Sequence, residues 1–249
     1  MKKIYRGFAL PVILCSVWLL ASFLSSASHP LFPAPGNVLS LLFSKFSSGE
    51  YVTSLLWSLS RNLTGFITGM LCGLMAGLIM GSHVRSGLLL SPTFNFFKQI
   101  SLLAWVPLLS MWFGQGEMAK VVLIAMASFY PMAVNTYAGM QALDRKLDEV
   151  AKISLLKPSA KFRLLTLPET SPFLYTGAHL SLIYSWVATI AAEYFFSSAP
   201  GVANIIIDGR DTLDMAKIIS GMIIIAIVGY IINLLFMKLE KRQLHWVRK

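Results

Sequence analysis

The chain has 249 residues, of which 56% are hydrophobic and 13% are charged, and its mean hydropathy is +0.68. Soluble domains carry about a quarter charged residues, so the composition excludes an ordinary soluble protein and indicates a polytopic membrane protein. The net charge of +10 does not indicate nucleic-acid binding, because the basic residues are distributed among the loops between apolar runs, where they set membrane topology.

Six apolar runs are each long enough to cross a bilayer, which requires about 20 residues in a helix. We therefore predict an all-α fold, a membrane helix bundle of six transmembrane helices that forms a single domain over residues 1–249. The third run is interrupted by Pro92, Lys98 and Pro107. The first is long for a signal peptide, so we expect it to be an uncleaved helix. The predicted spans cover roughly residues 8–27, 59–81, 88–112, 118–138, 175–197 and 217–237.

Lysines and arginines are concentrated at the two ends of the chain and in residues 145–163. Basic residues next to membrane spans stay predominantly on the cytoplasmic side. We therefore predict that both termini and the Glu149–Pro168 loop are cytoplasmic. The basic residues expected on the opposite side are Lys45, Arg61, Lys120, Arg210 and Lys217. Asp208, Arg210, Asp211 and Asp214 are expected to form a loop on the opposite side, between the last two spans.

The second span has a glycine at every fourth position. At helical geometry these residues form one nearly straight seam, which allows a neighbouring helix to approach closely. The seam indicates either a helix pair that slides during transport or static packing, and we favour static packing. In both cases the helix is buried in the bundle. The seam consists of Gly65, Gly69, Gly73, Gly77 and Gly81.

Among the ionisable residues inside the predicted spans, we single out Lys98 and Glu193. Charged groups in a membrane usually face the bundle interior or a water-filled path. Glu193 therefore either lines or gates a transport pathway or bonds to a neighbouring helix, and the sequence favours neither. For Lys98 we expect the ammonium group to extend to the cytoplasmic interface.

The segment from Glu149 to Pro168 is both basic and amphipathic. Apolar residues recur in it at helical spacing, among them Ile153, Leu156 and Phe162. Such a segment either lies on the membrane surface or docks into a partner protein. We favour docking over a solvated loop, because a solvated loop leaves the apolar face unexplained.

Glu149-x-Ala151 followed by Leu165-x-Leu167-Pro168 resembles the "EAA" loop of bacterial ABC-importer permeases, inner-membrane subunits that work with a periplasmic binding protein. The family pattern is E-A-A, three residues, G, nine residues, I-x-L-P. Here Val150 replaces the first alanine and Leu155 replaces the glycine at the turn. We expect the turn to move to Lys157-Pro158, since proline disfavours a helical conformation before it and starts a helix well.

The resemblance implies a type I importer permease fold in which a coupling loop over residues 141–172 contacts the ATPase. The residues that it implicates in this coupling are Glu149, Ala151, Leu155, Leu156, Lys157 and Pro168.

Ser58-Leu59-x-Arg61 resembles the start of the corresponding helix in this family. Trp105-x-Pro107-Leu108 and Ala191-Ala192-Glu193 are similar to segments of the branch that handles sulfonates, taurine and nitrate. We take Trp105, Pro107 and Glu193 as candidates for lining or gating the pathway. The resemblance implies a permease homodimer that works with two copies of an ABC ATPase and a periplasmic substrate-binding protein. It also implies that the chain lies in the bacterial inner membrane, in contact with membrane lipid.

Several kinds of chemistry have no signature in the sequence. It contains neither a G-x-x-x-x-G-K-[ST] motif nor any Gly-Lys pair, so we expect no cofactor on this chain and ATP on a separate subunit. The four histidines lack ligand spacing, so we expect no metal site. No G-x-S-x-G motif is present either, so we do not expect an enzyme.

Two alternatives to this interpretation remain. The chain could be a stand-alone secondary transporter or channel, although such proteins usually place several ionisable residues or interrupted helices at the midplane. It could also be the same type of permease importing a vitamin precursor rather than an anion.

Overall fold

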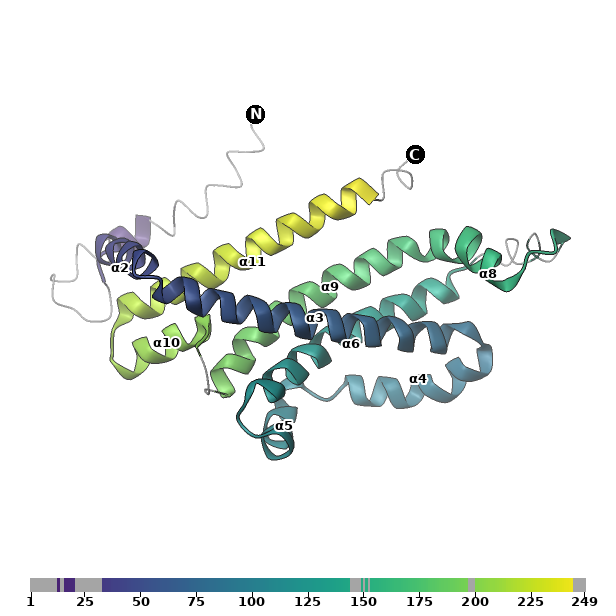
Figure 1. The fold of residues 1–249 in the computed structure, drawn as a ribbon, viewed down its shortest axis with the longest axis horizontal. Coiled ribbons are helices and arrows are strands. Elements are labelled where there is room, and N and C mark those ends of the chain that lie inside the picture. The colour runs from purple at the N-terminus through teal and green to yellow at the C-terminus, as the bar shows by residue number, and fades with distance from the viewer. Residues whose placement is uncertain are drawn as a thin grey trace. The chain divides into compact units, whose positions relative to one another are not determined.

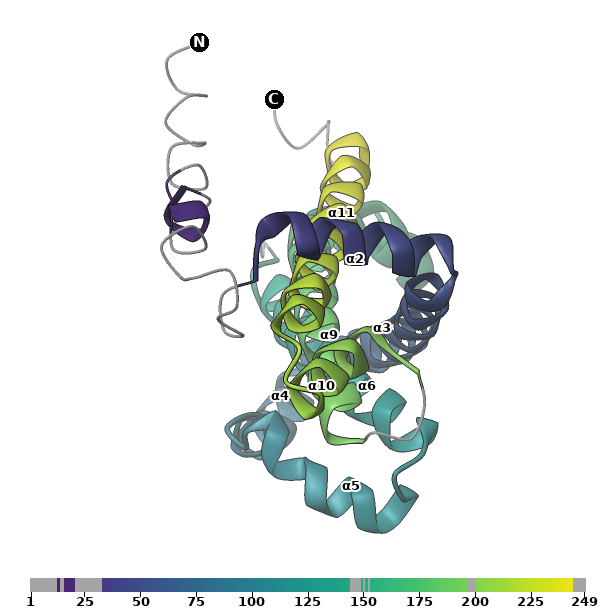
Figure 2. The same ribbon diagram turned by 90° about the vertical axis from the view of Figure 1, so that its left-hand side faces the viewer.

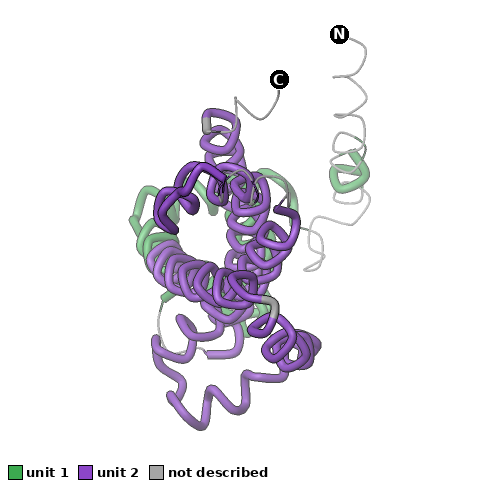
Figure 3. The backbone as a smooth tube through the Cα atoms, turned by 90° about the vertical axis from the view of Figure 1, so that its right-hand side faces the viewer, with its two compact units in different colours: residues 1–57, 200–227 green, residues 58–199, 228–249 purple. Residues whose placement is uncertain are grey.

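The structure is a computed structural model, which describes residues 13, 16–20, 33–143, 149, 151, 153–196 and 200–243. All regular structure in these ranges is helical. Most of the first predicted span, residues 8–27, lies outside them. The chain divides into two compact units, residues 1–57 with 200–227 and residues 58–199 with 228–249 (Figure 3).

The first unit is built around the contact between two helices near the end of the chain, α10 (Val202–Asp211) and the first part of α11 (Met215–Gln243). They pack closely, because a side chain at Gly209 or Gly221 would lie under 3.0 Å from the facing helix. The unit also contains α2 (Pro35–Ser47) and the first residues of α3 (Glu50–Ser82). The prediction of a loop was therefore wrong for Asp208, Arg210 and Asp211, which belong to α10, whereas Asp214 lies between α10 and α11.

The second unit is built on α6 (Glu117–Gln141) and α9 (Leu167–Phe195), which run antiparallel and make the most extensive helix contact in the described part of the chain (Figure 1). Small residues permit this contact, because a side chain at Gly139 would meet Phe173 and one at Gly177 would meet Asn135. The remaining elements of this unit are the rest of α3, α4 (Val84–Lys98), η1 (Leu102–Trp105), α5 (Val106–Phe113), α8 (Pro158–Lys161), the π-helical turn η2 (Phe162–Thr166) and the end of α11.

The glycine seam of α3 lies against α6. At each of the five positions an added Cβ would lie under 3.0 Å from an atom of α6, and at Gly69 that atom is the backbone carbonyl oxygen of Ala125. The oxygen belongs to the backbone, so it cannot move aside without shifting the helix. Ser128 of α6 also donates a hydrogen bond to the carbonyl of Phe66 at 3.0 Å. The seam therefore sets the distance between the two helices.

Among the described residues, three helices, α3, α6 and α11, are long and apolar enough to cross a membrane. The 25 residues of α6 extend about 37 Å, which exceeds the ~30 Å of a hydrocarbon core. α9 has 29 residues, which is also the length of a span, but it is not one of these three. The predicted number of six spans stays a prediction.

The third predicted span is two helices, α4 and η1–α5, which meet at 86° across residues 99–101. Figure 2 shows α5 running across the direction of α6 and α9. Pro92 lies inside α4, whereas Pro107 lies in the first turn of α5, where a proline costs no hydrogen bond. The break therefore precedes Pro107 and is not caused by a kink at it.

Candidate functional site

An open cavity of about 490 Å³, called the central cavity below, lies in the second unit, beside the break between α4 and η1. Part of its lining is exposed, including Lys98 and Tyr184. Its wall includes Tyr130 near the midpoint of α6 and Tyr184 near the midpoint of α9, so it lies at about half the height of the bundle. The full lining is Lys98, Gln99, Ile100, Ser101, Leu102, Trp105, Ala127, Tyr130, Pro131, Val134, Asn135, Leu180 and Tyr184.

The lining combines aromatic and aliphatic walls with a few polar groups. Trp105, Tyr130 and Tyr184 supply three aromatic rings, and Lys98 supplies the one cationic side chain of the lining. The amide of Asn135 donates to the carbonyl of Pro131 at 2.8 Å, within its own helix. Mostly apolar pockets with a few polar groups are typical of sites for small molecules.

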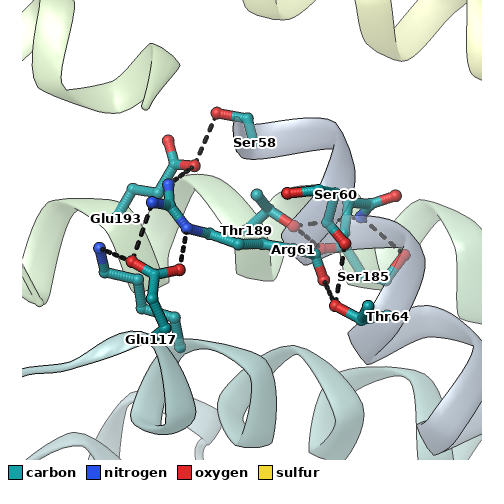
Figure 4. Close-up of polar contacts among 10 residues, drawn as sticks. Ser58, Ser60, Arg61, Thr64, Glu117, Ser185, Thr189 and Glu193 are labelled. Carbon is teal, nitrogen blue, oxygen red and sulfur yellow. Dashed lines mark hydrogen bonds and ion pairs between the residues drawn. The ribbon is translucent and has the colours of Figure 1, made fainter. Parts of the chain in front are cut away.

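A second feature is a network of charged side chains that joins α3, α6 and α9 (Figure 4). Arg61 of α3 forms a two-point ion pair with Glu117 of α6 and donates a further bond to Glu193 of α9 at 2.9 Å. Ser58 donates to the same oxygen of Glu193 at 2.6 Å, and the ammonium of Lys120 lies 3.2 Å from Glu117. Glu117 is 42% exposed, whereas the side chains of Arg61, Lys120 and Glu193 are 2%, 0% and 0% exposed. Two cations therefore meet two carboxylates, and the network is close to neutral.

A smaller set of hydrogen bonds continues from this network along α3 and α9. The amide of Asn62 donates to Ser185 and to Thr189, at 3.1 Å in each case. Buried polar groups in a membrane need such partners, since no water is available to replace them. The polar face of α3 is therefore fastened to α9 beside the ion network.

The structure separates the three pathway candidates. Trp105 lines the central cavity, and Pro107 lies just beyond it in α5 without contributing to the lining. Glu193 does not line the cavity and is buried against Arg61 instead. Of the two interpretations that the sequence left open, this placement corresponds to a carboxylate bonded to a neighbouring helix.

Arg61 and Lys120 were expected on the side opposite to residues 145–163, as charges that set topology, but both are buried inside helices. Glu117 was not singled out at all. The signal was available in principle, because an arginine within an apolar run requires a partner. Which carboxylate meets it depends on the packing of three helices, and the sequence does not fix that packing.

The segment from Glu149 to Pro168 turns at Leu155. This leucine has a left-handed backbone with φ 48°, and the amide of Leu156 donates to the carbonyl of Ala151 at 3.0 Å. Lys157 is extended, and Pro158 begins α8. The turn therefore stays at the position where the family pattern has glycine, and the expected break at Lys157-Pro158 follows it as a second feature.

The side chains of this segment divide into a buried and an exposed set. Ala151 is buried and Pro168 is partly buried in the first turn of α9, while Glu149 and Lys157 are exposed. Leu155 is 90% exposed and Ile153 is 82% exposed. Apolar side chains therefore project from the turn, and no described residue covers them.

The chain is similar to known membrane transport proteins over most of its length. Residues 69–249 match the family model of the binding-protein-dependent transport system inner membrane component. The chain is 32% identical to the putative aliphatic sulfonates transport permease protein SsuC of Bacillus subtilis, over 97% of this chain and 87% of that protein. It is also 32% identical to the protein of the same name from Escherichia coli, over 95% of this chain and 90% of the other.

More distant similarities extend over most of the chain. The bicarbonate transport system permease protein CmpB of Synechococcus elongatus is 27% identical over 78% of this chain and 71% of that protein. Among solved structures, the MetNI methionine ABC transporter in its inward-facing conformation aligns with a TM-score of 0.65 at 17% identity, over 76% of this chain and 94% of that chain. At 17% identity, this alignment shows a shared fold and nothing more specific.

Proposed function

The chain belongs to the binding-protein-dependent transport system inner membrane components, the permeases of ABC importers, and on that premise we propose that it imports small organic anions of the sulfonate type. As a member of this family it is a multi-pass membrane protein and a component of a transporter rather than an enzyme. ABC importers work with ATPase and substrate-binding partners. The choice of substrate, the coupling site and the stoichiometry belong to the proposal.

The coupling site that we propose is the turn at Leu155. The observation that carries this part is an exposed leucine in a backbone conformation that an L-residue adopts at a cost of roughly 1–2 kcal/mol. Glycine would avoid that cost. An exposed apolar side chain on a strained backbone is best explained by a partner protein that binds it. The ATPase subunit is the partner that this family requires.

The substrate proposal rests on the two SsuC proteins, which are named for aliphatic sulfonates and resemble this chain over nearly its whole length. The bicarbonate permease gives a second candidate, a small inorganic anion, but at lower identity and coverage. Both candidates carry one negative charge near neutral pH, so they differ mainly in the presence of an apolar part.

The assembly that we propose contains two copies of the permease, two ATPase subunits and a periplasmic binding protein. It lies in the inner membrane with both termini and the Leu155 turn in the cytoplasm, where the basic residues are concentrated. ATP binding closes the ATPase pair, and the turn transmits this motion to α9, which follows it in the chain.

Uptake into vesicles tests the proposal. Membranes containing the permease, its ATPase and its binding protein are expected to accumulate a labelled alkanesulfonate only when ATP is supplied. Omission of the ATPase should abolish uptake. Uptake driven by an ion gradient without the ATPase would refute the importer mechanism and favour a stand-alone transporter.

A further inference from the structure

The central cavity holds a lysine without a carboxylate partner. Within the described residues no aspartate or glutamate lies within ion-pair distance of Lys98, whereas Arg61 and Lys120 are both neutralised by the buried network. Charged residues inside a membrane protein are costly and are therefore usually functional. Lys98 is itself exposed where it lines the cavity, so of these three cations it is the one that remains available to an anion.

Helix geometry places Lys98 far from the end of the bundle at which α4 begins. α4 begins beside the C-terminal end of α6, since His83 and Gly87 share a surface pocket with Tyr137 and Gln141. At 1.5 Å per residue, Lys98 lies about 20 Å along α4 from that end. This is further than a lysine side chain extends, so the ammonium lies away from that end of the bundle. That it extends to the cytoplasmic interface stays a prediction.

The rest of the cavity suits an apolar group. Trp105, Tyr130 and Tyr184 line it together with aliphatic residues, and neither tyrosine hydroxyl makes a hydrogen bond to another described residue. Those hydroxyls are therefore available to donate to the oxygens of a ligand. The volume of about 490 Å³ falls in the ~300–1,000 Å³ range of small-molecule sites.

We propose that this cavity is a substrate site within the permease itself, which binds a small organic anion with its charged head at Lys98 and its apolar tail along the aromatic wall. The inference rests on the proposed function and narrows it. Bicarbonate or nitrate would satisfy Lys98 but leave the aromatic wall without contacts. The cavity therefore selects sulfonates with a hydrocarbon part, and selection of substrate is shared between the binding protein and this chain.

Equilibrium binding to the purified permease–ATPase complex in lipid nanodiscs, without the binding protein, tests the site. The probe is radiolabelled butanesulfonate, displaced by unlabelled alkanesulfonates from ethane- to hexanesulfonate. Burial of one methylene contributes about fourfold in affinity, so each added carbon is expected to strengthen binding by about that factor until the cavity is full. Nitrate is expected to displace the probe only weakly.

Matched variants separate the two parts of the site. Lys98→Gln is expected to weaken butanesulfonate binding about 10- to 100-fold, the loss typical of a hydrogen bond to a charged group, while Lys98→Arg retains most of it. Tyr184→Ala is expected to reduce the gain per methylene. Lys238→Gln, an exposed lysine of α11 that lies outside the cavity, is the control and should bind as the wild type does.

The outcomes distinguish this inference from the proposed function. No saturable binding by the wild type, or equal binding by Lys98→Gln, would overturn the cavity site even if the complete transporter imports sulfonates. Failure of the wild-type transporter to import any sulfonate with ATP would instead overturn the proposed substrate. Equal affinity for nitrate and butanesulfonate would overturn the role of the aromatic wall.

Discussion

Replacement of Arg61 by methionine tests whether the buried network holds α3, α6 and α9 together. Arg61 is 2% exposed and pairs with both Glu117 and Glu193, of which Glu193 is fully buried. Its removal takes from the buried Glu193 the guanidinium that lies 2.9 Å from it. Removing one member of a buried ion pair typically costs 3–5 kcal/mol, so we expect the free energy of unfolding to fall by about that amount.

The same contacts predict that a second substitution, at Glu193, restores part of the stability lost in Arg61→Met. Arg61→Met combined with Glu193→Gln removes both charges of the buried Arg61–Glu193 pair, while Glu117 keeps Lys120 as a partner at 3.2 Å. Replacement of a whole buried pair is often nearly neutral. The double variant is therefore expected to be more stable than Arg61→Met alone, with a coupling energy of about 1–3 kcal/mol.

Reversible unfolding of the reconstituted protein in a denaturing detergent measures both values. Arg85→Met, at an exposed position of α4, is the control and should change stability by less than about 0.5 kcal/mol. A loss below about 1 kcal/mol for Arg61→Met, or a double variant less stable than the single one, would refute the view that Arg61 compensates a buried carboxylate.

Two further predictions concern the helix seam and the turn. Gly69→Ala places a methyl group against the carbonyl oxygen of Ala125 and is expected to lower the free energy of unfolding by about 1–3 kcal/mol in the same assay. Gly36→Ala, with open space around it, is the control and should be neutral or slightly stabilising. Equal effects of the two substitutions would show that the α3–α6 contact is not close. Leu155→Gly removes the cost of the left-handed backbone conformation and is expected to raise the free energy of unfolding by about 1 kcal/mol. The same variant is expected to lower substrate-stimulated ATP hydrolysis, because the exposed side chain is lost. Unchanged hydrolysis would contradict a docking role.

The sequence was sufficient for the helical class because long apolar runs leave few alternatives in a membrane. It also indicated the side of α3 that meets α6, since glycines at every fourth residue define one face regardless of the partner. The break in the third span was visible as an interruption, but its position at residues 99–101 was not. The three interrupting residues are not equivalent: Pro92 is accommodated within α4, and Pro107 starts a helix.

The polar sites depended on contacts that sequence spacing does not encode. Arg61 and Glu193 are 132 positions apart in the chain, so their pairing follows only from the packing of α3 against α9. The cavity likewise combines residues from α4, η1, α6 and α9. At Leu155 the local rule was misleading, because a left-handed backbone is normally assigned to glycine. The absence of glycine suggested that the turn had moved, whereas the leucine adopts that conformation.

The most direct test of the importer mechanism is a crosslink at the tip of the turn. Leu155 is replaced by cysteine in a chain whose own two cysteines, Cys15 and Cys72, have been replaced, and the purified transporter is treated with a short thiol crosslinker. We predict a crosslink to the ATPase subunit whose yield changes when ATP is bound. A crosslink at Leu155 that never includes the ATPase, in a transporter that still hydrolyses ATP when substrate is supplied, would contradict the account.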